Sequence, residues 1–209
     1  MEGNMVKKLT KRQKKSEENK KKIVNCAMHL FAKYGYDNVS IDDIAKLANS
    51  SKGSFYNYFN NKDELFIYYR QALIAQYLEF YEQLLHDPSY RIYNGLQKFY
   101  LMCMFILNCM TSNGDEFARI SDMRLFRDWV DIQEEMGYKD NYDIIFPALI
   151  NQGKADGSIN KELTVDEIIS NLRLYFDGIM YDWEVSRGTY NIIDRYSYML
   201  EFFCYSIAG

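Results

Sequence analysis

The chain has 209 residues, of which 48% are hydrophobic and 16% aromatic, enough for one large or two small domains with a sizeable core. Its four cysteines form no Cys-x-x-Cys pair and only two histidines could assist a metal site, so we expect buried reduced thiols, no metal and no cofactor. The N-terminus lacks an apolar signal core, and the longest apolar run, residues 99–107, is far shorter than a membrane span, so we expect a cytoplasmic protein.

The net charge of −4 hides an asymmetry along the chain. Residues 1–65 carry 13 Lys and Arg against 8 Asp and Glu, whereas residues 66–209 carry 12 against 21. A basic head on an acidic body suits a protein that holds a polyanion at one end and repels it at the other. A random division of solvated surface charges would give a difference of the same size, so both interpretations stay open.

Residues 1–15 are polar and rich in lysine, which predicts a disordered basic arm. In a DNA-binding protein such an arm can follow phosphates or the minor groove, and a solvated tail would have the same composition. Apolar residues at helical spacing then predict a helix from about Ser16 to Tyr34, ended by Gly35. Lysines at positions 20–22 occupy its first half, where the helix dipole favours acids, so they are more useful if a phosphate lies near.

Residues 40–62 predict two short helices joined by a tight turn. Ser40 is placed to cap the first helix, and Asp43 can complete a capping box. Asn49 tolerates the left-handed conformation that a helix stop needs, and Ser51 can cap the helix that follows.

The second short helix, residues 52–59, is too short and too poor in aliphatic residues to be stable alone. Phe55 and Phe59 lie four apart and can pack on one side, while most of the other side chains are hydrogen-bond donors. A supported short helix that presents donors is what insertion into the DNA major groove requires. Gly53 costs about 1 kcal/mol of helix stability relative to alanine, which is easier to explain if a phosphate or a backbone approaches closely. The alternative is a helical corner whose polar side is solvated.

The rest of the chain shows helical periodicity and little β-branched alternation, so we expect an all-α fold of about nine helices. Asn61 can cap a long helix that ends near His86 and connects a head to a body as one rigid element, with the domain boundary near Phe66. In the irregular segment at residues 124–155, Pro147 either begins a helix or kinks one. The other expected helices span about residues 88–110, 115–123, 165–187 and 191–207.

From about Lys21 to Leu65 the sequence resembles the N-terminal domain of the tetracycline-repressor (TetR) family of transcriptional regulators. The chain differs in the turn, where the family usually has Gly-Val and this chain has Asn49-Ser50. Asparagine can replace the glycine conformation, whereas Ser50 removes a buried valine. The resemblance is carried by residues 23–36, 40–45, 48, 51–56, 58–59 and 62–65.

The resemblance implies a helix-turn-helix DNA-binding domain at residues 16–65 and a helical ligand-binding and dimerisation domain at residues 66–209. It implies a regulator, most often a repressor, that binds a palindromic operator as a homodimer and is released by a small molecule. The dense aromatic and methionine side chains of the body predict that this molecule is largely apolar or aromatic. Tyr56, Tyr58 and Lys62 would hold phosphates. The full set of implied DNA contacts is Ser40, Ser51, Lys52, Gly53, Ser54, Tyr56, Asn57, Tyr58 and Lys62, of which Lys52, Ser54 and Asn57 would reach base edges.

In the family the last two helices pair with their copies as a four-helix bundle, although two adjacent apolar stripes can also form the core of one chain. The implied dimer interface comprises Leu172, Phe176, Ile179, Met180, Trp183, Tyr196, Met199, Leu200 and Phe203. Aromatic and sulfur-containing side chains of the body, which are more often core than pocket, are the candidate ligand contacts. These are Tyr100, Cys103, Met104, Leu107, Phe126, Trp129 and Tyr175.

Two other classes of function are weighed against this one. An enzyme is disfavoured because the sequence has no nucleophile motif, no glycine-rich phosphate loop and no metal-ligand spacing. A helical protein-interaction or small-molecule-binding module without DNA binding is the alternative, and it would show no salt-dependent affinity for any duplex.

Overall fold

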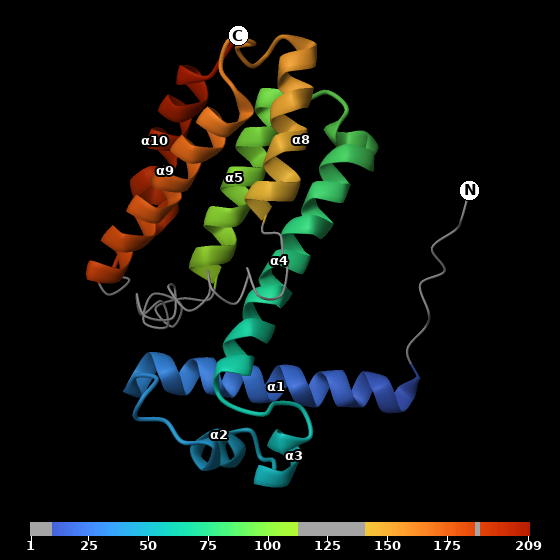
Figure 1. Cartoon of the computed structure of the whole chain (residues 1–209), viewed down its shortest axis with the longest axis vertical. Coiled ribbons are helices and arrows are strands. Elements are labelled where there is room, and N and C mark those ends of the chain that lie inside the picture. The colour runs from blue at the N-terminus through green and yellow to red at the C-terminus, as the bar shows by residue number, and fades with distance from the viewer. Residues whose placement is uncertain (1–9, 113–140, 187–188) are drawn as a thin grey trace. The chain divides into compact units, whose positions relative to one another are not determined.

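The computed structural model describes residues 10–112, 141–186 and 189–209, and within these ranges it contains eight α-helices and no strand (Figure 1). The predicted all-α fold is confirmed, and the helix predicted at 115–123 lies outside the described residues. The helices are α1 (Lys11–Tyr34), α2 (Ile41–Leu47), α3 (Lys52–Tyr56), α4 (Asp63–His86), α5 (Gly95–Ser112), α8 (Asn141–Asp156), α9 (Val165–Val185) and α10 (Ile192–Ser206), with a 3₁₀ helix η1 (Pro88–Tyr90) before α5.

The chain divides into two compact units, Met1–Tyr69 and Arg70–Gly209, and α4 begins in the first unit and continues into the second. In the first unit α1 packs on α2, and α2 packs on α3. Apolar side chains from all four helices of this unit are almost completely buried and form one core. The largest of them are Ile23, Phe31, Ile44, Phe55 and Leu65.

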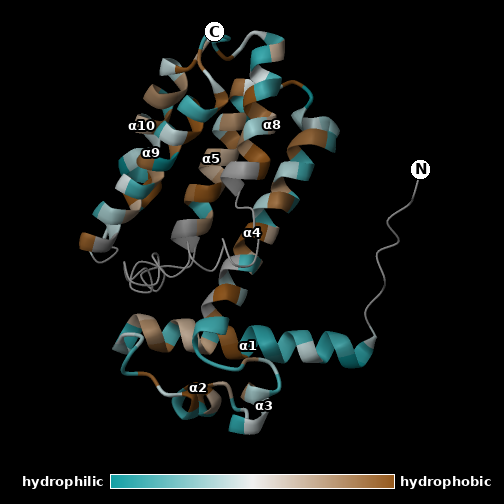
Figure 2. Cartoon of the chain, in the orientation of Figure 1, coloured by the Kyte–Doolittle hydropathy of each residue, from teal (hydrophilic) through white to brown (hydrophobic). Residues whose placement is uncertain are grey.

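Helix α1 begins at Lys11, earlier than the predicted start at Ser16. Thr10 Oγ1 accepts a hydrogen bond from the Gln13 backbone N–H at 3.3 Å, and Gln13 Oε1 accepts one from the Thr10 N–H at 2.9 Å. This capping box extends the helix into the basic segment, so the prediction of a disordered arm as far as residue 15 is wrong. Residues 1–9 lie outside the described residues. Figure 2 shows that the N-terminal half of α1 is strongly hydrophilic and that apolar residues appear only in its second half.

In the second unit, α5 packs against both α8 and α10, and α8 packs against α9. Phe99 on α5 is fully buried, with its ring centroid 5.3 Å from that of Phe146 on α8. On its other side the Phe99 ring stacks with Phe203 of α10 at 6.1 Å. Aromatic contacts therefore join α8 and α10 to α5.

Helix α5 begins at Gly95 and not at Pro88 as predicted. Asn94 Oδ1 accepts a hydrogen bond from the Gln97 N–H at 2.9 Å, and Gln97 Oε1 accepts one from the Asn94 N–H at 3.0 Å. This reciprocal cap starts the helix after η1 has ended. Pro147 lies inside α8, so the alternative in which it begins a helix is wrong.

All four cysteines are free thiols; three of them are buried, and Cys26 is half-buried. Burial raises the pKa of the Cys103 thiol well above its ordinary value and that of Cys204 to about 12, so both stay protonated at neutral pH. None of the helices in the described ranges has both the length and the apolarity needed to cross a membrane. In the same ranges, His, Cys, Asp and Glu form no group of three that could hold a metal ion.

Candidate nucleic-acid interface

Helix α2 is fixed at both ends by the hydrogen bonds that its sequence predicts. Ser40 Oγ accepts from the Asp43 N–H at 3.2 Å, and the Asp43 carboxylate accepts from the Ser40 N–H at 3.0 Å. The bonds to Ser40 hold the pKa of Asp43 below its ordinary value. At the other end Asn49 has a φ of 52°, and the Ser50 N–H donates to the Ala45 carbonyl at 2.9 Å. The predicted cap and helix stop are confirmed.

Helix α3 contains only five residues, and the buried side chain of Phe55 packs it into the core of the first unit, called the head below. Phe55 is completely buried, and its ring centroid lies 5.6 Å from that of Phe59, which in turn lies 5.9 Å from Tyr68. Ser51 caps the helix, since its Oγ accepts from the Ser54 N–H at 3.0 Å. Packing and capping therefore hold a helix that is too short to be stable by itself.

The polar side chains of α3 face solvent. Lys52 and Asn57 are exposed, and Tyr56 keeps 49% of its surface accessible although its neighbour Phe55 has none. Ser54 is half-buried, and its hydroxyl lies 2.9 Å from that of Ser51.

Lys52 already has an acidic partner on α2. Its Nζ lies 2.8 Å from the Asp42 carboxylate, and this hydrogen bond raises the pKa of Lys52 above its ordinary value. More than half of each side chain is exposed, so the ion pair contributes little stability. A phosphate or a base edge can therefore replace Asp42 as the partner of Lys52 at small cost.

Gly53 occupies an open position on α3. A Cβ placed there would meet only the Ser51 Oγ, at an ordinary contact distance of 3.8 Å. Nothing in the described residues requires glycine here, although glycine destabilises a helix. The close approach of another molecule, predicted from the sequence, stays a prediction.

The structure assigns Lys62 to an internal role. Its Nζ donates hydrogen bonds of 2.8 Å to the backbone carbonyls of both Tyr36 and Val39, and it lies 4.3 Å from the centre of the Tyr36 ring. The side chain therefore fastens the loop after α1 to the start of α4. Two of the three ammonium hydrogens are thus engaged within the chain, and the predicted phosphate contact of Lys62 stays a prediction. Tyr58 is also turned inward, since its hydroxyl accepts from Ser16 Oγ at 3.4 Å.

We expect Lys62→Met to destabilise the first unit by about 2 kcal/mol, because two charge-assisted hydrogen bonds to backbone carbonyls are lost and the Tyr36 carbonyl keeps only the longer bond from the Val39 N–H at 3.4 Å. Hydrogen exchange should rise at the amides of residues 35–40, and the melting temperature should fall. Lys46→Met, which removes an exposed lysine of the same unit, is the control and should change neither. The phosphate role would be supported if Lys62→Met left amide hydrogen exchange unchanged. In that case the slope of log K for DNA binding against log salt should be flatter by about one than in the wild type.

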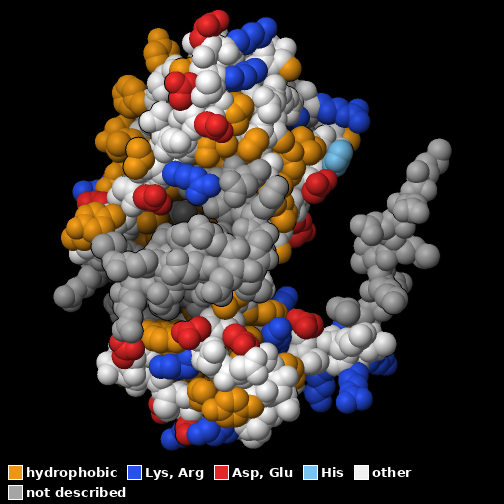
Figure 3. All heavy atoms as spheres, in the orientation of Figure 1, with side chains coloured by type: hydrophobic (Ala, Val, Ile, Leu, Met, Phe, Trp, Pro, Cys, Tyr) orange, Lys and Arg blue, Asp and Glu red, His pale blue; other side chains and the backbone are white. Residues whose placement is uncertain are grey.

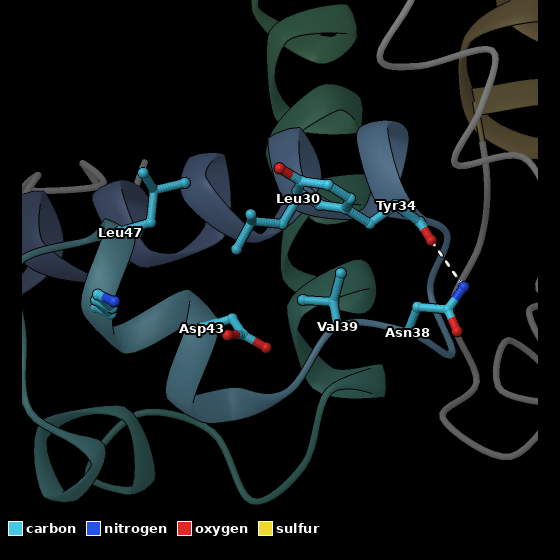
Figure 4. Close-up of a pocket in the computed structure, with 7 residues that line it drawn as sticks. Leu30, Tyr34, Asn38, Val39, Asp43 and Leu47 are labelled. Atoms are coloured by element: carbon cyan, nitrogen blue, oxygen red, sulfur yellow. Dashed lines mark hydrogen bonds between the residues drawn. The ribbon is translucent and has the colours of Figure 1, made fainter.

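A hollow of about 600 Å³ lies in the first unit between α1 and α2 (Figure 4). Leu30 and Tyr34 line it from α1, Val39 and Asn38 from the loop, and Leu47 from α2, and no residue of α3 contributes. Two of its polar side chains are engaged within the chain, since Asn38 Nδ2 donates to the Tyr34 carbonyl at 2.9 Å and the Asp43 carboxylate accepts from the Ser40 N–H. The hollow is therefore separate from the polar surface of α3.

The structure brings together part of the predicted ligand-contact set in the second unit. Tyr100, Cys103 and Tyr175 are neighbours, with Cys204 beside them. Burial is the main cause that raises the pKa of Tyr175, and its hydroxyl donates to the Tyr196 carbonyl at 2.9 Å. Of the remaining predicted ligand contacts, one is half-buried, one is fully buried, and two lie outside the described residues: Met104, Leu107, Phe126 and Trp129.

Tyr175 also lines a hollow of about 510 Å³ at the surface of α9 and α10. Phe203 and Leu174 line the same hollow, together with Leu163 and Asn171. Tyr100, Cys103, Met104 and Leu107 do not line it. Of the predicted ligand contacts in the described part of the chain, Tyr175 alone lines this hollow, and the shared ligand site stays a prediction.

Most of the predicted dimer interface lies inside the chain's own core. The six buried members are Leu172, Phe176, Ile179, Met180, Trp183 and Leu200. Phe203 and Tyr196 are half-buried, and Tyr196 Oη donates to the Asp182 carboxylate at 2.5 Å. Met199 alone of the nine is exposed, at 40%. The strong apolar stripe of each helix therefore marks intrachain packing, which corrects the assignment of the six buried residues to an interface.

A second apolar stripe on α9 and α10 is exposed, and the sequence pattern did not reveal it. Its side chains keep between 55% and 83% of their surface accessible, and Figure 3 shows hydrophobic side chains along this edge of the second unit. They recur at helical spacing on each helix, and this weaker periodicity is the signal that could have found them. The exposed stripe consists of Leu174, Tyr181 and Val185 on α9 and Tyr198, Phe202 and Tyr205 on α10.

Comparison with known proteins gives a match in the first unit. The family described as "Bacterial regulatory proteins, tetR family" matches residues 23–69. The negative transcriptional regulator IcaR of the biofilm operon icaADBC of Staphylococcus epidermidis is 38% identical over 88 residues, which cover 41% of this chain and 45% of IcaR. The chain spans less than half the length of the first curated relatives that it matches.

Solved structures resemble this fold over most of the chain. The fatty acid degradation regulator FadR from Bacillus halodurans has a TM-score of 0.70 at 17% identity, with 90% of this chain and 93% of that chain covered. The transcriptional regulator FadR from Bacillus subtilis, solved in complex with stearoyl-CoA, has a TM-score of 0.66 at 20% identity, with 90% and 98% covered. These likenesses establish the fold of both units.

Proposed function

Because residues 23–69 make this chain a member of the tetR family of bacterial regulatory proteins, we propose that it is a transcriptional repressor that binds a palindromic DNA operator as a homodimer. One observation carries the proposal: burial of Phe55 holds α3 against the head while its polar side chains stay exposed. A short helix held in this way fits the major groove. Such a protein acts in the cytoplasm, where the chromosome is.

The residues of α3 divide into two roles in this proposal. Lys52 and Asn57 are exposed donors that reach base edges, Lys52 after leaving Asp42. Tyr56 donates its hydroxyl to a phosphate and sets the position of the helix on the duplex. Gly53 allows the DNA backbone to approach where a Cβ would stand.

We place the dimer interface on the exposed stripe of α9 and α10. Leu174 on α9 lines one hollow with Phe203 and Ser206 on α10, so the exposed faces of the two helices adjoin. Gly178 lies within the α9 stripe, and a Cβ at this position would meet nothing within 4 Å. Contiguous exposed apolar side chains of this kind favour a subunit interface, and an open glycine lets a second helix approach closely. A two-fold pair of heads then matches a two-fold operator.

The effector that releases the repressor is, in this proposal, a small molecule that is largely apolar or aromatic. Apolar and aromatic side chains dominate the described part of the second unit around Tyr100 and Tyr175. The structural relative FadR from Bacillus subtilis was solved with stearoyl-CoA, whose acyl chain has this character. Binding would favour a conformation of the body in which the two heads no longer fit both half-sites.

Selection of bound duplexes from random DNA with the full chain tests the proposal. We expect enrichment of a sequence with two-fold symmetry, whose half-sites are separated by about one helical turn or a multiple of it. Enrichment of no sequence, together with no salt-dependent affinity for any duplex, would favour the alternative of a protein-interaction or small-molecule-binding module. Enrichment of a single half-site would contradict the homodimer.

A further inference from the structure

The part of the head that matches the regulator family is not itself basic. Residues 23–69 contain four lysines and no arginine against five acidic residues. Two of the four lysines are engaged within the chain, Lys52 with Asp42 and Lys62 with two backbone carbonyls. A surface with this balance has little electrostatic attraction for a polyanion, and phosphate contacts supply most of the affinity of non-specific DNA binding.

The missing positive charge lies in the first half of α1. Residues 11–22 contain seven Lys and Arg against two Glu. All but Lys20 of the seven are exposed, and within the described residues none of these six forms an ion pair. The first turn of α1 contains no acid, although the helix dipole favours acids there. A cationic start is thus unfavourable for the helix alone, and an external anion would compensate it.

This half of α1 is held by Tyr58, two residues after α3, and by Tyr68 of α4, and it is not a free tail. Ser16 Oγ donates to the Tyr58 hydroxyl at 3.4 Å, and the Tyr68 hydroxyl donates to the Glu17 carboxylate at 3.2 Å. The Lys20 Nζ lies 4.3 Å from the centre of the Tyr68 ring. The first turns of α1 extend past α3 in Figure 1, and Figure 3 shows Lys and Arg side chains gathered along them.

We propose that the first turns of α1 bind the phosphate backbone that flanks each half-site, through Lys11, Arg12, Lys14 and Lys15. These four side chains lie within about 8 Å along the helix axis of the Ser16–Tyr58 contact, since each helical residue advances about 1.5 Å. In this proposal, a duplex that receives α3 in its major groove has its flanking phosphates within reach of these side chains. This inference rests on the proposed function, and it assigns much of the binding affinity to a segment that precedes the family match.

The test uses the full chain carrying Lys11→Gln, Arg12→Gln, Lys14→Gln and Lys15→Gln, because glutamine keeps the helix propensity and removes the charge. Affinity for the selected operator is measured by fluorescence anisotropy at several salt concentrations, on a long duplex and on one trimmed to the half-sites. We expect affinity for the long duplex to fall at least about 10-fold at about 0.15 M salt. The slope of log K against log salt should flatten by about 0.9 for each lost phosphate contact.

Three controls distinguish a lost phosphate contact from unfolding of α1 and from a change in net charge. Helical content by circular dichroism should be unchanged, and the charge-preserving variant Lys11→Arg, Lys14→Arg and Lys15→Arg should bind like the wild type. Arg91→Gln with Lys161→Gln, which removes two exposed charges of the second unit, should leave the slope unchanged. A glutamine variant that binds the long duplex with wild-type affinity and slope would overturn the inference and leave the proposed function standing. A wild-type protein that prefers no duplex would overturn both.

Discussion

Leu174→Glu combined with Phe202→Glu is expected to convert the proposed homodimer into monomers and to lower operator affinity by at least about 100-fold. The two side chains keep 71% and 69% of their surface exposed in the chain, so their replacement removes little intrachain packing. Stability of the monomer should change by less than about 1 kcal/mol, as is usual for surface positions. Four glutamates facing one another across a two-fold axis would, in contrast, be desolvated together and would repel.

The large loss of affinity follows from the linkage between the two heads. In a dimer, binding of one head raises the effective concentration of the second head at its half-site to the millimolar range, without any new contact. A monomer loses this advantage entirely. Light scattering after size exclusion gives the mass, and anisotropy on the operator gives the affinity.

Ile92→Glu is the matched control for this prediction. Ile92 is 80% exposed and apolar, but it lies in the segment between η1 and α5 and not on the stripe of α9 and α10. This variant should remain a dimer with wild-type affinity. Leu172→Ala provides the opposite control, because Leu172 is fully buried and its truncation should cost about 2–5 kcal/mol of stability. A glutamate double variant that stays dimeric would place the interface elsewhere.

The parts of the fold that depend on neighbouring residues were predictable from the sequence. Ser40 and Asp43 exchange the hydrogen bonds that their spacing predicts, and Thr164 and Glu167, which have the same spacing, exchange the same pair of bonds. Asn49 adopts the left-handed conformation that replaces the usual glycine. A capping box joins residues three apart in sequence, so its hydrogen bonds do not depend on tertiary contacts. The predicted start of α5 was wrong because proline is common at the first position of a helix, and Pro88 was therefore taken as the start. The capping box of Asn94 and Gln97 starts the helix at Gly95 instead.

The features that the sequence did not predict depend on distant contacts. Lys62 bonds to carbonyls of residues far from it in sequence, and no local spacing distinguishes such a lysine from one that binds phosphate. Residues 11–15 have the composition of a disordered arm, yet they form the first turns of α1. The Thr10–Gln13 capping box lies at the start of these turns, and the Ser16–Tyr58 contact follows them. The apolar periodicity of α9 correctly predicted which side of the helix is buried. It could not show that the chain itself covers that face, because a hydrophobic pattern does not specify its partner.

Substitutions of the adjacent residues Phe55 and Tyr56 should have different effects, the first mainly on folding and the second mainly on DNA binding. Phe55→Ala is expected to destabilise the first unit by about 3–5 kcal/mol, since the fully buried ring is the main anchor of a helix of five residues. Operator binding should then disappear together with the helical signal of the head. Tyr56→Ala should cost less than about 1.5 kcal/mol, mainly its edge contact with the Phe55 ring at 5.5 Å.

Operator affinity should nevertheless fall at least about 10-fold in Tyr56→Ala, because a hydroxyl and an aromatic surface are lost where the duplex lies. Since the lost group is neutral, the slope of log K against log salt should not change, in contrast to the variants of α1. Leu47→Ala is the matched control, because Leu47 is 47% exposed, close to the 49% of Tyr56, but belongs to α2. Equal affinities for Tyr56→Ala and wild type would remove α3 from the interface. A loss in Leu47→Ala as large as in Tyr56→Ala would mean that exposed apolar surface anywhere on the head, and not the polar side of α3, binds DNA.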